Sequence, residues 1–152
     1  MMKFLRAGAV TISLAAFAQP VIGHDHAAGV VKERMDMMET MAKHMKAITE
    51  RIKGKTDLGA IKPNAEAIAE HAPHLVHLFP KGSMQRPTEA RPAIWQNWQD
   101  FEGKASAVKI EAKKLAAIDA KDFPALEAGV LALSKTCSAC HEKYRVRKVK
   151  GE

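Results

Sequence analysis

Aromatic residues are scarce in this sequence, strand-like alternation is absent, and the chain has only two cysteines. Aromatic side chains make up 5% of the 152 residues, and no basic stretch is interleaved with them as in segments that stack on nucleic-acid bases. Neither paired carboxylates nor an activated nucleophile can be placed, so we expect neither a nucleic-acid-binding protein nor an enzyme. No internal repeat or low-complexity tract divides the chain, and its 47% hydrophobic content is typical of one globular domain.

The first 23 residues have the layout of a secretory signal peptide. Two basic residues precede an apolar run that ends at Ala18, and small residues follow it. The run is too short to span a bilayer with ease. We predict cleavage after Gly23, with Ala18 as the second choice, so that residues 24–152 form the mature domain in the periplasm. The alternative is a retained N-terminal anchor or buried helix.

The mature chain has a modest excess of positive charge. Loss of Lys3 and Arg6 with the signal peptide lowers the formal net charge from +7 to about +5. Basic residues are spread along the chain, apart from a dense run at its end, KYRVRKVK, residues 143–150. We interpret this charge as a source of solubility and of a preference for acidic surfaces on partner proteins.

Helical signals occur in four segments, two of them in the first half of the chain. In the first, about residues 28–53, apolar residues recur at steps of three and four, and Gly54 is expected to end the helix. The second covers about residues 59–78 and contains Pro73, which costs about 3 kcal/mol in a helix interior. We therefore predict a kink or break near Ala72.

The other two helical segments follow an irregular loop at residues 79–92, which holds three prolines and a glycine. The third helix is expected from Pro92 to about Ile118, with a broad apolar stripe. Asp122 can cap the fourth, with Pro124 in its first turn. The predicted inward positions of the fourth helix are Leu126, Val130, Leu133, Cys137, Cys140, His141 and Tyr144. Four amphipathic helices predict an all-α, antiparallel four-helix bundle.

The two cysteines fit several chemistries. On a helix, Cys137 and Cys140 have Cβ atoms about 5 to 6 Å apart, whereas a disulfide needs about 3.8 Å. A thioredoxin-type dithiol opens a helix after a strand, and this pair lies near a helix end with no βαβ pattern before it. A structural zinc site needs four ligands, of which this motif supplies three. The remaining candidates for the fourth are His71, His74 and His77, which we expect to be mostly exposed and which suit no compact tridentate site.

C-x-x-C-H in a chain with an export signal favours covalent attachment of one haem c. Each cysteine sulfur adds to a haem vinyl group, so thioethers at Cys137 and Cys140 fix the porphyrin to one helical face. His141, four residues after Cys137, projects from that face and would be the proximal iron ligand. A cofactor of this size also explains how a bundle with few aromatic residues fills its centre.

The ending CSACHEKYR, residues 137–145, together with RPAIW at 91–95 and LFP at 78–80, resembles the cytochrome c′ family, the class II c-type cytochromes. The resemblance covers nearly the whole mature chain and implies a four-helix bundle with the haem motif near its C-terminus. It implies haem attachment at both cysteines, His141 as the proximal ligand and Arg145 as a neighbour of a haem propionate. The alternative for Arg145 is a solvent-facing charge in the basic tail. Members often dimerise through their first two helices, so a homodimer is a further expectation.

The resemblance also has an implication for the distal side of the haem iron, opposite His141. It implies a distal residue on the first helix, four places after an arginine that approaches the haem propionates. Here the arginine is Arg34 and the distal position is Met38. High-spin members place a non-ligating side chain there and leave the iron five-coordinate, whereas the low-spin branch places an iron-binding methionine there. Met41 shares the face of Met38, so Met41 or no methionine at all remains an alternative.

Histidine with methionine is a ligand set for electron transfer. We therefore predict a periplasmic carrier of single electrons between redox partner proteins, with Lys143 to Lys150 steering partner docking. The first alternative is a five-coordinate cytochrome c′ that binds nitric oxide or carbon monoxide. A further alternative is a periplasmic transition-metal-binding protein, because cleavage after Gly23 would leave an amino-terminal His-Asp-His whose His26 can complete a square-planar copper or nickel site.

Overall fold

The computed structural model describes residues 27–146, so the predicted signal peptide, its cleavage site, His26 and most of the basic tail lie outside the described residues. Among residues 27–146 no strand occurs, and the one β-type pairing is an isolated bridge between Ala90 and Arg145. No helix in this range is long and apolar enough to cross a membrane. The helices are α1 (Gly29–Gly54), η1 (Leu58–Ala60), α2 (Ile61–His71), η2 (Ala72–Leu78), α3 (Ala93–Gln96), α4 (Trp98–Ala116) and α5 (Phe123–Tyr144), where η denotes a 3₁₀ helix.

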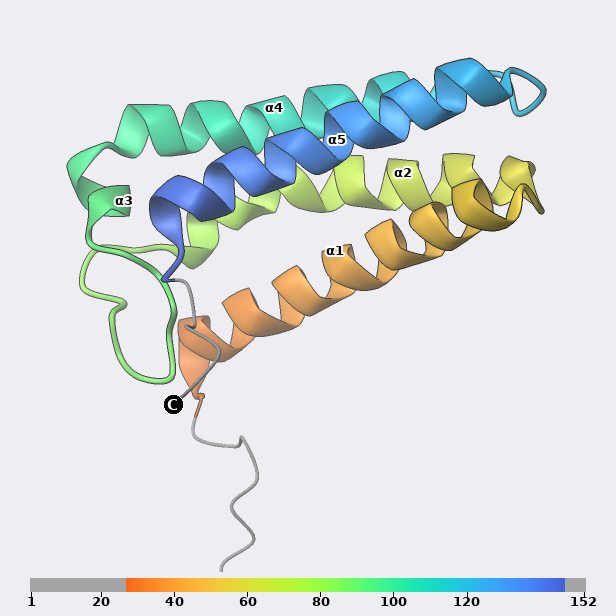
Figure 1. Ribbon diagram of the computed structural model, residues 1–152. Coiled ribbons are helices and arrows are strands. Elements are labelled where there is room, and N and C mark those ends of the chain that lie inside the picture. Colours follow the sequence, from red (N-terminus) through yellow and green to blue (C-terminus); the bar gives the residue numbers. More distant parts are fainter. Residues whose placement is uncertain (1–26, 147–152) are drawn as a thin grey trace, which may run out of the picture.

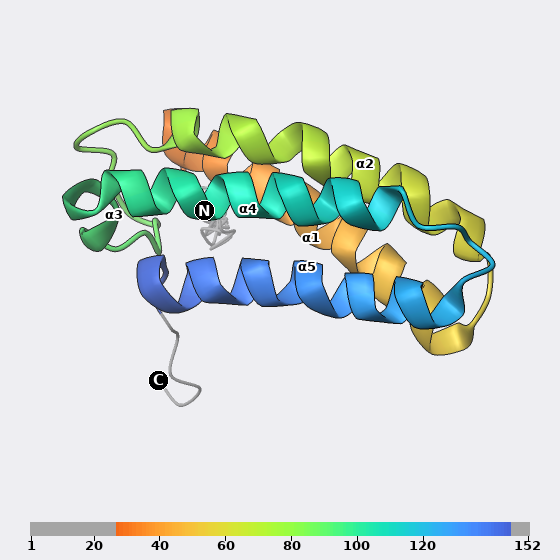
Figure 2. The ribbon, with the colours of Figure 1, turned by 90° about the horizontal axis from the view of Figure 1, so that it is seen from above.

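The four long helices form an antiparallel bundle (Figures 1 and 2). α2 and its continuation η2 contact both α1 and α4, while α5 contacts α4 and α1. The start of α1 and the end of α5 lie at the same end of the bundle, where α3 and the loop 79–92 are also found. The prediction of an all-α, antiparallel four-helix bundle is confirmed.

The first two predicted helices occur close to their expected positions, and the first ends at Gly54 as expected. Gly54 is the last helical residue, and Lys55, not a glycine, takes the left-handed conformation with φ of 50°. The amide groups of Lys55 and Thr56 donate to the carbonyls of Ile52 and Arg51, which closes the helix end without a glycine at that position. The break near Ala72 is confirmed: α2 ends at His71 and a 3₁₀ helix follows.

The third predicted helix is divided, which the apolar stripe did not indicate. Asn97 has φ of −130° and ψ of 48°, outside the helical region, and separates α3 from α4. Its backbone amide and side-chain amide both donate to the carbonyl of Ala93 at 3.0 Å. A side chain that bonds its own preceding turn competes with helix continuation. The bend also lets Trp95 Nε1 donate to the carbonyl of Phe79 at 2.9 Å, which ties α3 to the loop.

The fourth predicted helix is confirmed as α5. The Asp122 carboxylate accepts a hydrogen bond from the Ala125 amide at 3.0 Å, as an N-cap residue does. Leu126 and Leu133 are almost fully buried, and Tyr144 is buried near the helix end.

Buried side chains form two clusters, and residues of the candidate site pack against both. The main core lies between the four long helices and includes Ile48, Ile68, Val108, Leu115 and Leu133. The aromatic cluster lies at the end of the bundle that carries the loop 79–92, and consists of Phe79, Ile94, Phe101 and Tyr144. Phe101 contacts both Phe79 and Tyr144 edge to face, with ring centroids 4.8 and 5.4 Å apart.

Candidate functional site

Cys137 and Cys140 are free, half-buried thiols on the uninterrupted helix α5. Cys137 packs against the main core and Cys140 against the aromatic cluster. Burial raises the pKa of the Cys137 thiol, and burial raises the pKa of Cys140 to about 11. Both sulfurs are therefore protonated at neutral pH, in contrast to redox and nucleophilic cysteines, whose pKa is lowered. These apolar, half-buried surroundings suit thiols that form covalent bonds to an apolar group.

His141 lies next to this pair but does not occupy a buried position. The residue is exposed, and Tyr144, three residues later, is the buried residue at this end of α5. The prediction that His141 points inward with the apolar stripe was therefore wrong, because successive helical residues are about 100° apart and His141 lies beside the stripe of Cys140 and Tyr144. Partial burial of the ring and the charge of Arg145 lower the pKa of His141. The imidazole is therefore neutral at physiological pH and has a lone pair for a metal.

Met38 lies on α1 where the main core and the aromatic cluster meet. It is half-buried and packs against both clusters, whereas Met41 is buried in the main core alone. The two cysteines are divided between the same two clusters. Of the methionines on α1, Met38 is therefore the one that shares surroundings with both Cys137 and Cys140.

Arg34 is buried beneath the loop, with 5% of its surface exposed. Its Nε and Nη2 donate to the Leu78 carbonyl at 2.9 and 2.8 Å, and Nη2 donates to Ser83 Oγ at 2.6 Å. Its Nη1 donates to Thr88 Oγ1 at 2.8 Å, and the guanidinium carbon lies 4.0 Å from the centroid of the Phe79 ring. Burial lowers the pKa of Arg34. Every guanidinium nitrogen has a protein acceptor, so the contacts within the chain explain its burial, and an approach to a haem propionate stays a prediction.

Arg145 fastens the end of α5 to the loop. Its Nε and Nη2 both lie close to Glu89 Oε2, at 2.7 and 2.6 Å. The backbone pairs here too, since the Arg91 amide donates to the Tyr144 carbonyl at 2.9 Å and the Val146 amide to the Glu89 carbonyl at 2.8 Å. Arg145 is exposed and its charge is paired with Glu89. Its predicted contact with a propionate stays a prediction.

The first lysine of the basic tail is also paired. Lys143 Nζ lies 3.0 Å from Asp100 Oδ2, and Tyr144 Oη donates to the same oxygen at 2.5 Å. The hydrogen bond from Tyr144, followed by that from Lys143, lowers the pKa of Asp100. These partners come from α4 and were not found by sequence reasoning, since no local pattern links residues more than forty positions apart.

The donor set fits covalent haem c. Two protonated thiols lie on one helix with a neutral imidazole directly after the second, and a methionine from α1 packs against the same two clusters. Apolar and aromatic side chains of the two clusters pack against these half-buried sulfur-containing residues. A haem would be held by Cys137 and Cys140, with His141 and Met38 as candidate ligands, and these roles stay predictions.

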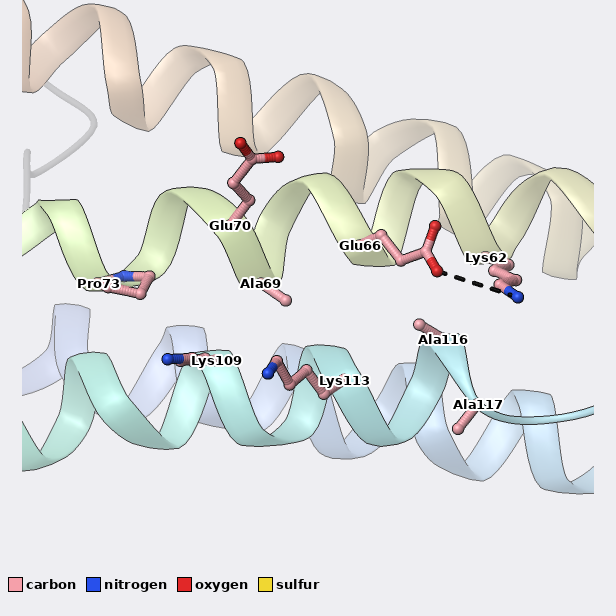
Figure 3. Close-up of a pocket in the computed structure, with 9 residues that line it drawn as sticks. All are labelled: Lys62, Glu66, Ala69, Glu70, Pro73, Lys109, Lys113, Ala116 and Ala117. Carbon is pink, nitrogen blue, oxygen red and sulfur yellow. Dashed lines mark ion pairs between the residues drawn. The ribbon is translucent and has the colours of Figure 1, made fainter.

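One surface groove lies away from the candidate site. It has a volume of about 610 Å³ between α2 and α4, and none of the predicted haem residues lines it. Figure 3 shows Lys62 and Glu66 paired along one wall, with Lys62 Nζ 4.0 Å from Glu66 Oε1, and Glu70 pointing away from α4. A smaller groove of about 230 Å³ lies beside the aromatic cluster, lined by Phe79, Pro80, Lys81, Trp95 and Trp98.

Within residues 27–146, no group of three or more histidine, cysteine or acidic residues is arranged to hold a metal ion. His74 and His77 are exposed on η2, and His71 is half-buried at the end of α2. The structure therefore does not bring these three together with the cysteine motif.

Comparison with known proteins points to one family. The family model described as Cytochrome C′ matches residues 29–145. Cytochrome c-556 of Agrobacterium tumefaciens (strain II Chrys) is 36% identical over 127 residues, covering 80% of this chain and 100% of that protein. Cytochrome c′ of Pararhodospirillum photometricum is 37% identical over 120 residues, covering 76% of this chain and 94% of that protein. Among solved structures, a nitric oxide complex of a variant of cytochrome c prime from Alcaligenes xylosoxidans has a TM-score of 0.69 at 31% identity, covering 78% of this chain and 94% of that chain.

Proposed function

This chain belongs to the cytochrome c′ family of c-type haem proteins, and we propose that it is a periplasmic electron carrier whose haem c is ligated by His141 and Met38. The family binds haem c and comprises electron carriers and gas-binding proteins. The choice between these two activities depends on whether the distal side of the iron is filled by a protein ligand.

The position of Met38 is the observation that carries the proposal. Its side chain packs against both the main core and the aromatic cluster. Cys137 packs against the main core and Cys140 against the aromatic cluster. A thioether is a soft sulfur donor, and histidine with methionine raises the reduction potential of haem iron. Met41 is buried in the main core alone, which favours Met38 as the ligand.

The remaining residues have positioning roles in this proposal. Cys137 and Cys140 hold the cofactor to α5 by two thioethers. His141, with its lowered pKa, remains neutral and able to bind iron at physiological pH. When bound, the haem supplies a one-electron iron couple, and two protein ligands leave no open position for a substrate.

An optical spectrum of the oxidised and reduced holoprotein tests the proposal. We expect low-spin spectra with the methionine-to-iron charge-transfer band at the red end, and loss of that band in Met38→Leu. The matched control is Met41→Leu, which changes a methionine one turn away and should retain the band. Loss of the band in Met41→Leu instead would assign the ligand to Met41.

The alternative is a five-coordinate, gas-binding cytochrome c′. It is supported by the relative described as a nitric oxide complex. A high-spin spectrum of the unsubstituted protein, together with rapid carbon monoxide binding to the ferrous form, would favour this alternative and reject the electron carrier.

Redox partners are proposed to dock through positive charge near the haem. Of the basic tail, Lys143 and Arg145 are described, and both are paired with carboxylates, Asp100 and Glu89. Their pairing reduces the positive field that they present, so any steering would depend on residues 147–150. If neutralising Lys148 and Lys150 leaves the salt dependence of electron transfer unchanged, the docking proposal is rejected.

A further inference from the structure

His44 on α1 and His71 at the end of α2 face each other across the interface between these helices. Their ring centroids are 6.2 Å apart, with an angle of 32° between the ring planes. Both residues are half-buried, so part of each remains accessible to solvent. We propose that these two imidazoles bind a divalent transition-metal ion such as Zn²⁺, at a site separate from the haem residues.

The surroundings of His44 prepare its ring as a ligand. Its Nδ1 lies 2.9 Å from Asn64 Oδ1. The orientation of the Asn64 amide is fixed, because its Nδ2 donates to the Ala60 carbonyl at 2.7 Å and a carbonyl can only accept. The oxygen of Asn64 therefore faces His44, and in the neutral ring Nδ1 carries the proton.

This tautomer leaves Nε2 of His44 with its lone pair. Metal-binding histidines commonly donate their other ring N–H to a carbonyl or carboxylate, which fixes the ring orientation. Asn64 supplies that acceptor and is itself anchored to the backbone of the turn that begins α2. The arrangement is therefore a supported ligand and not merely an isolated surface histidine.

His71 supplies the second imidazole. Within the described part of the chain, no hydrogen bond occupies either nitrogen of its ring. An ion about 2.0 Å from a nitrogen of each ring would place the centroids about 5 Å apart in tetrahedral geometry. The observed 6.2 Å requires the rings to close by about 1 Å, which side-chain rotation of a half-buried histidine at a helix end can supply.

Two protein ligands leave the other coordination positions to water. Imidazole suits Zn²⁺, Cu²⁺ and Ni²⁺, and a two-ligand site is expected to bind them reversibly and more weakly than a structural zinc site. An ion there would link the middle of α1 to the end of α2. Binding to the folded state alone would stabilise the bundle in proportion to the free metal concentration.

The test is calorimetric titration of Zn²⁺ into the holoprotein at neutral pH. All proteins compared carry His24→Ala and His26→Ala, so that the amino-terminal histidines do not contribute. We expect His44→Ala and His71→Ala each to weaken zinc binding at least tenfold. Asn64→Ala should weaken it about tenfold, the lower end of the effect of losing such a supporting partner.

Matched controls are His74→Ala and His77→Ala, which remove exposed histidines from the neighbouring helix η2 and should leave the affinity unchanged. Far-ultraviolet circular dichroism verifies that each variant is folded, and an unchanged haem spectrum on zinc addition verifies that the haem ligands are not the site. The proposal is overturned if the parent binds no zinc, if His44→Ala or His71→Ala binds it as tightly as the parent, or if His74→Ala abolishes binding.

Discussion

Replacement of Arg34 by methionine should destabilise the protein severely, because the buried guanidinium donates hydrogen bonds to several acceptors outside α1. The side chain connects α1 to Leu78, at the end of η2, and to the loop 79–92 through acceptors that lie 44 to 54 residues further along the chain. Met retains an apolar stem of similar length and removes every donor. The variant therefore isolates the hydrogen-bonding function of the guanidinium from its packing.

The magnitude follows from the groups left behind. Arg34→Met leaves the carbonyl oxygens of Leu78 and Ser83 without their guanidinium donors, and an unsatisfied buried acceptor costs about 1 to 3 kcal/mol. The lost contact between the guanidinium and the ring of Phe79, at 4.0 Å, adds about 1 kcal/mol. The guanidinium is desolvated in the folded protein, as its lowered pKa indicates. Its removal also removes this desolvation cost, which offsets part of the loss. We expect a net decrease of about 3 kcal/mol in the free energy of unfolding.

Urea unfolding of the holoprotein at 25 °C, followed by circular dichroism, measures this decrease. The matched control is Arg86→Met, which makes the same substitution at an exposed position of the same loop and should change stability by less than about 0.5 kcal/mol. A loss of under about 1 kcal/mol in Arg34→Met, or an equal loss in Arg86→Met, would refute the reasoning.

Three further predictions concern α5. Leu133→Ala removes a side chain with no exposed surface and should lower the free energy of unfolding by about 3 kcal/mol, measured by urea unfolding. Asp122→Ala removes the acceptor of the Ala125 amide and should cost about 1 kcal/mol in the same assay, whereas Asp122→Asn should cost little. Tyr144→Phe removes the largest cause of the lowered pKa of Asp100, so carbon-13 NMR titration should show that pKa rising toward its ordinary value. Because a depressed carboxyl pKa stabilises the fold above the unfolded-state pKa and the benefit is lost as pH falls through the folded-state pKa, the variant should lose less stability on acidification than the parent.

Local signals were sufficient for most of the helical framework. Period and capping residues act within a few positions, so the break at Pro73 and the cap at Asp122 could be predicted from the sequence alone. The division at Asn97 could not, because an asparagine inside an apolar stripe has the same local pattern whether it continues the helix or bonds the preceding turn. The left-handed Lys55 was missed for a similar reason, since the glycine beside it was the more obvious candidate.

The same distinction between local and distant signals applies to the residues of the candidate site. Cys137, Cys140 and His141 form a contiguous motif whose spacing carries its chemistry, and the structure adds only that His141 lies beside the buried stripe. The partners of Arg34 and Lys143 are different, because they come from segments far away in the chain and consist of ordinary serine, threonine and aspartate residues. No spacing rule predicts which of several such residues in a loop will face a buried guanidinium.

Arg34 also bears on the choice between Met38 and Met41. Residues four apart on a helix are about 40° apart around its axis, and residues three apart about 60°. A rotation of α1 about its axis by about 60° would therefore place Met41 where Met38 now packs against the aromatic cluster. The hydrogen bonds from Arg34 to the loop oppose such a rotation. The rotation of α1 is restricted either by these loop contacts or by the packing of its own core residues. The methionine-to-iron charge-transfer band of folded Arg34→Met distinguishes the two. If the band weakens while far-ultraviolet circular dichroism is unchanged, the loop contacts orient the methionine. If it is retained in full, the packing of Met41 and Ile48 in the main core is sufficient to set the rotation of α1.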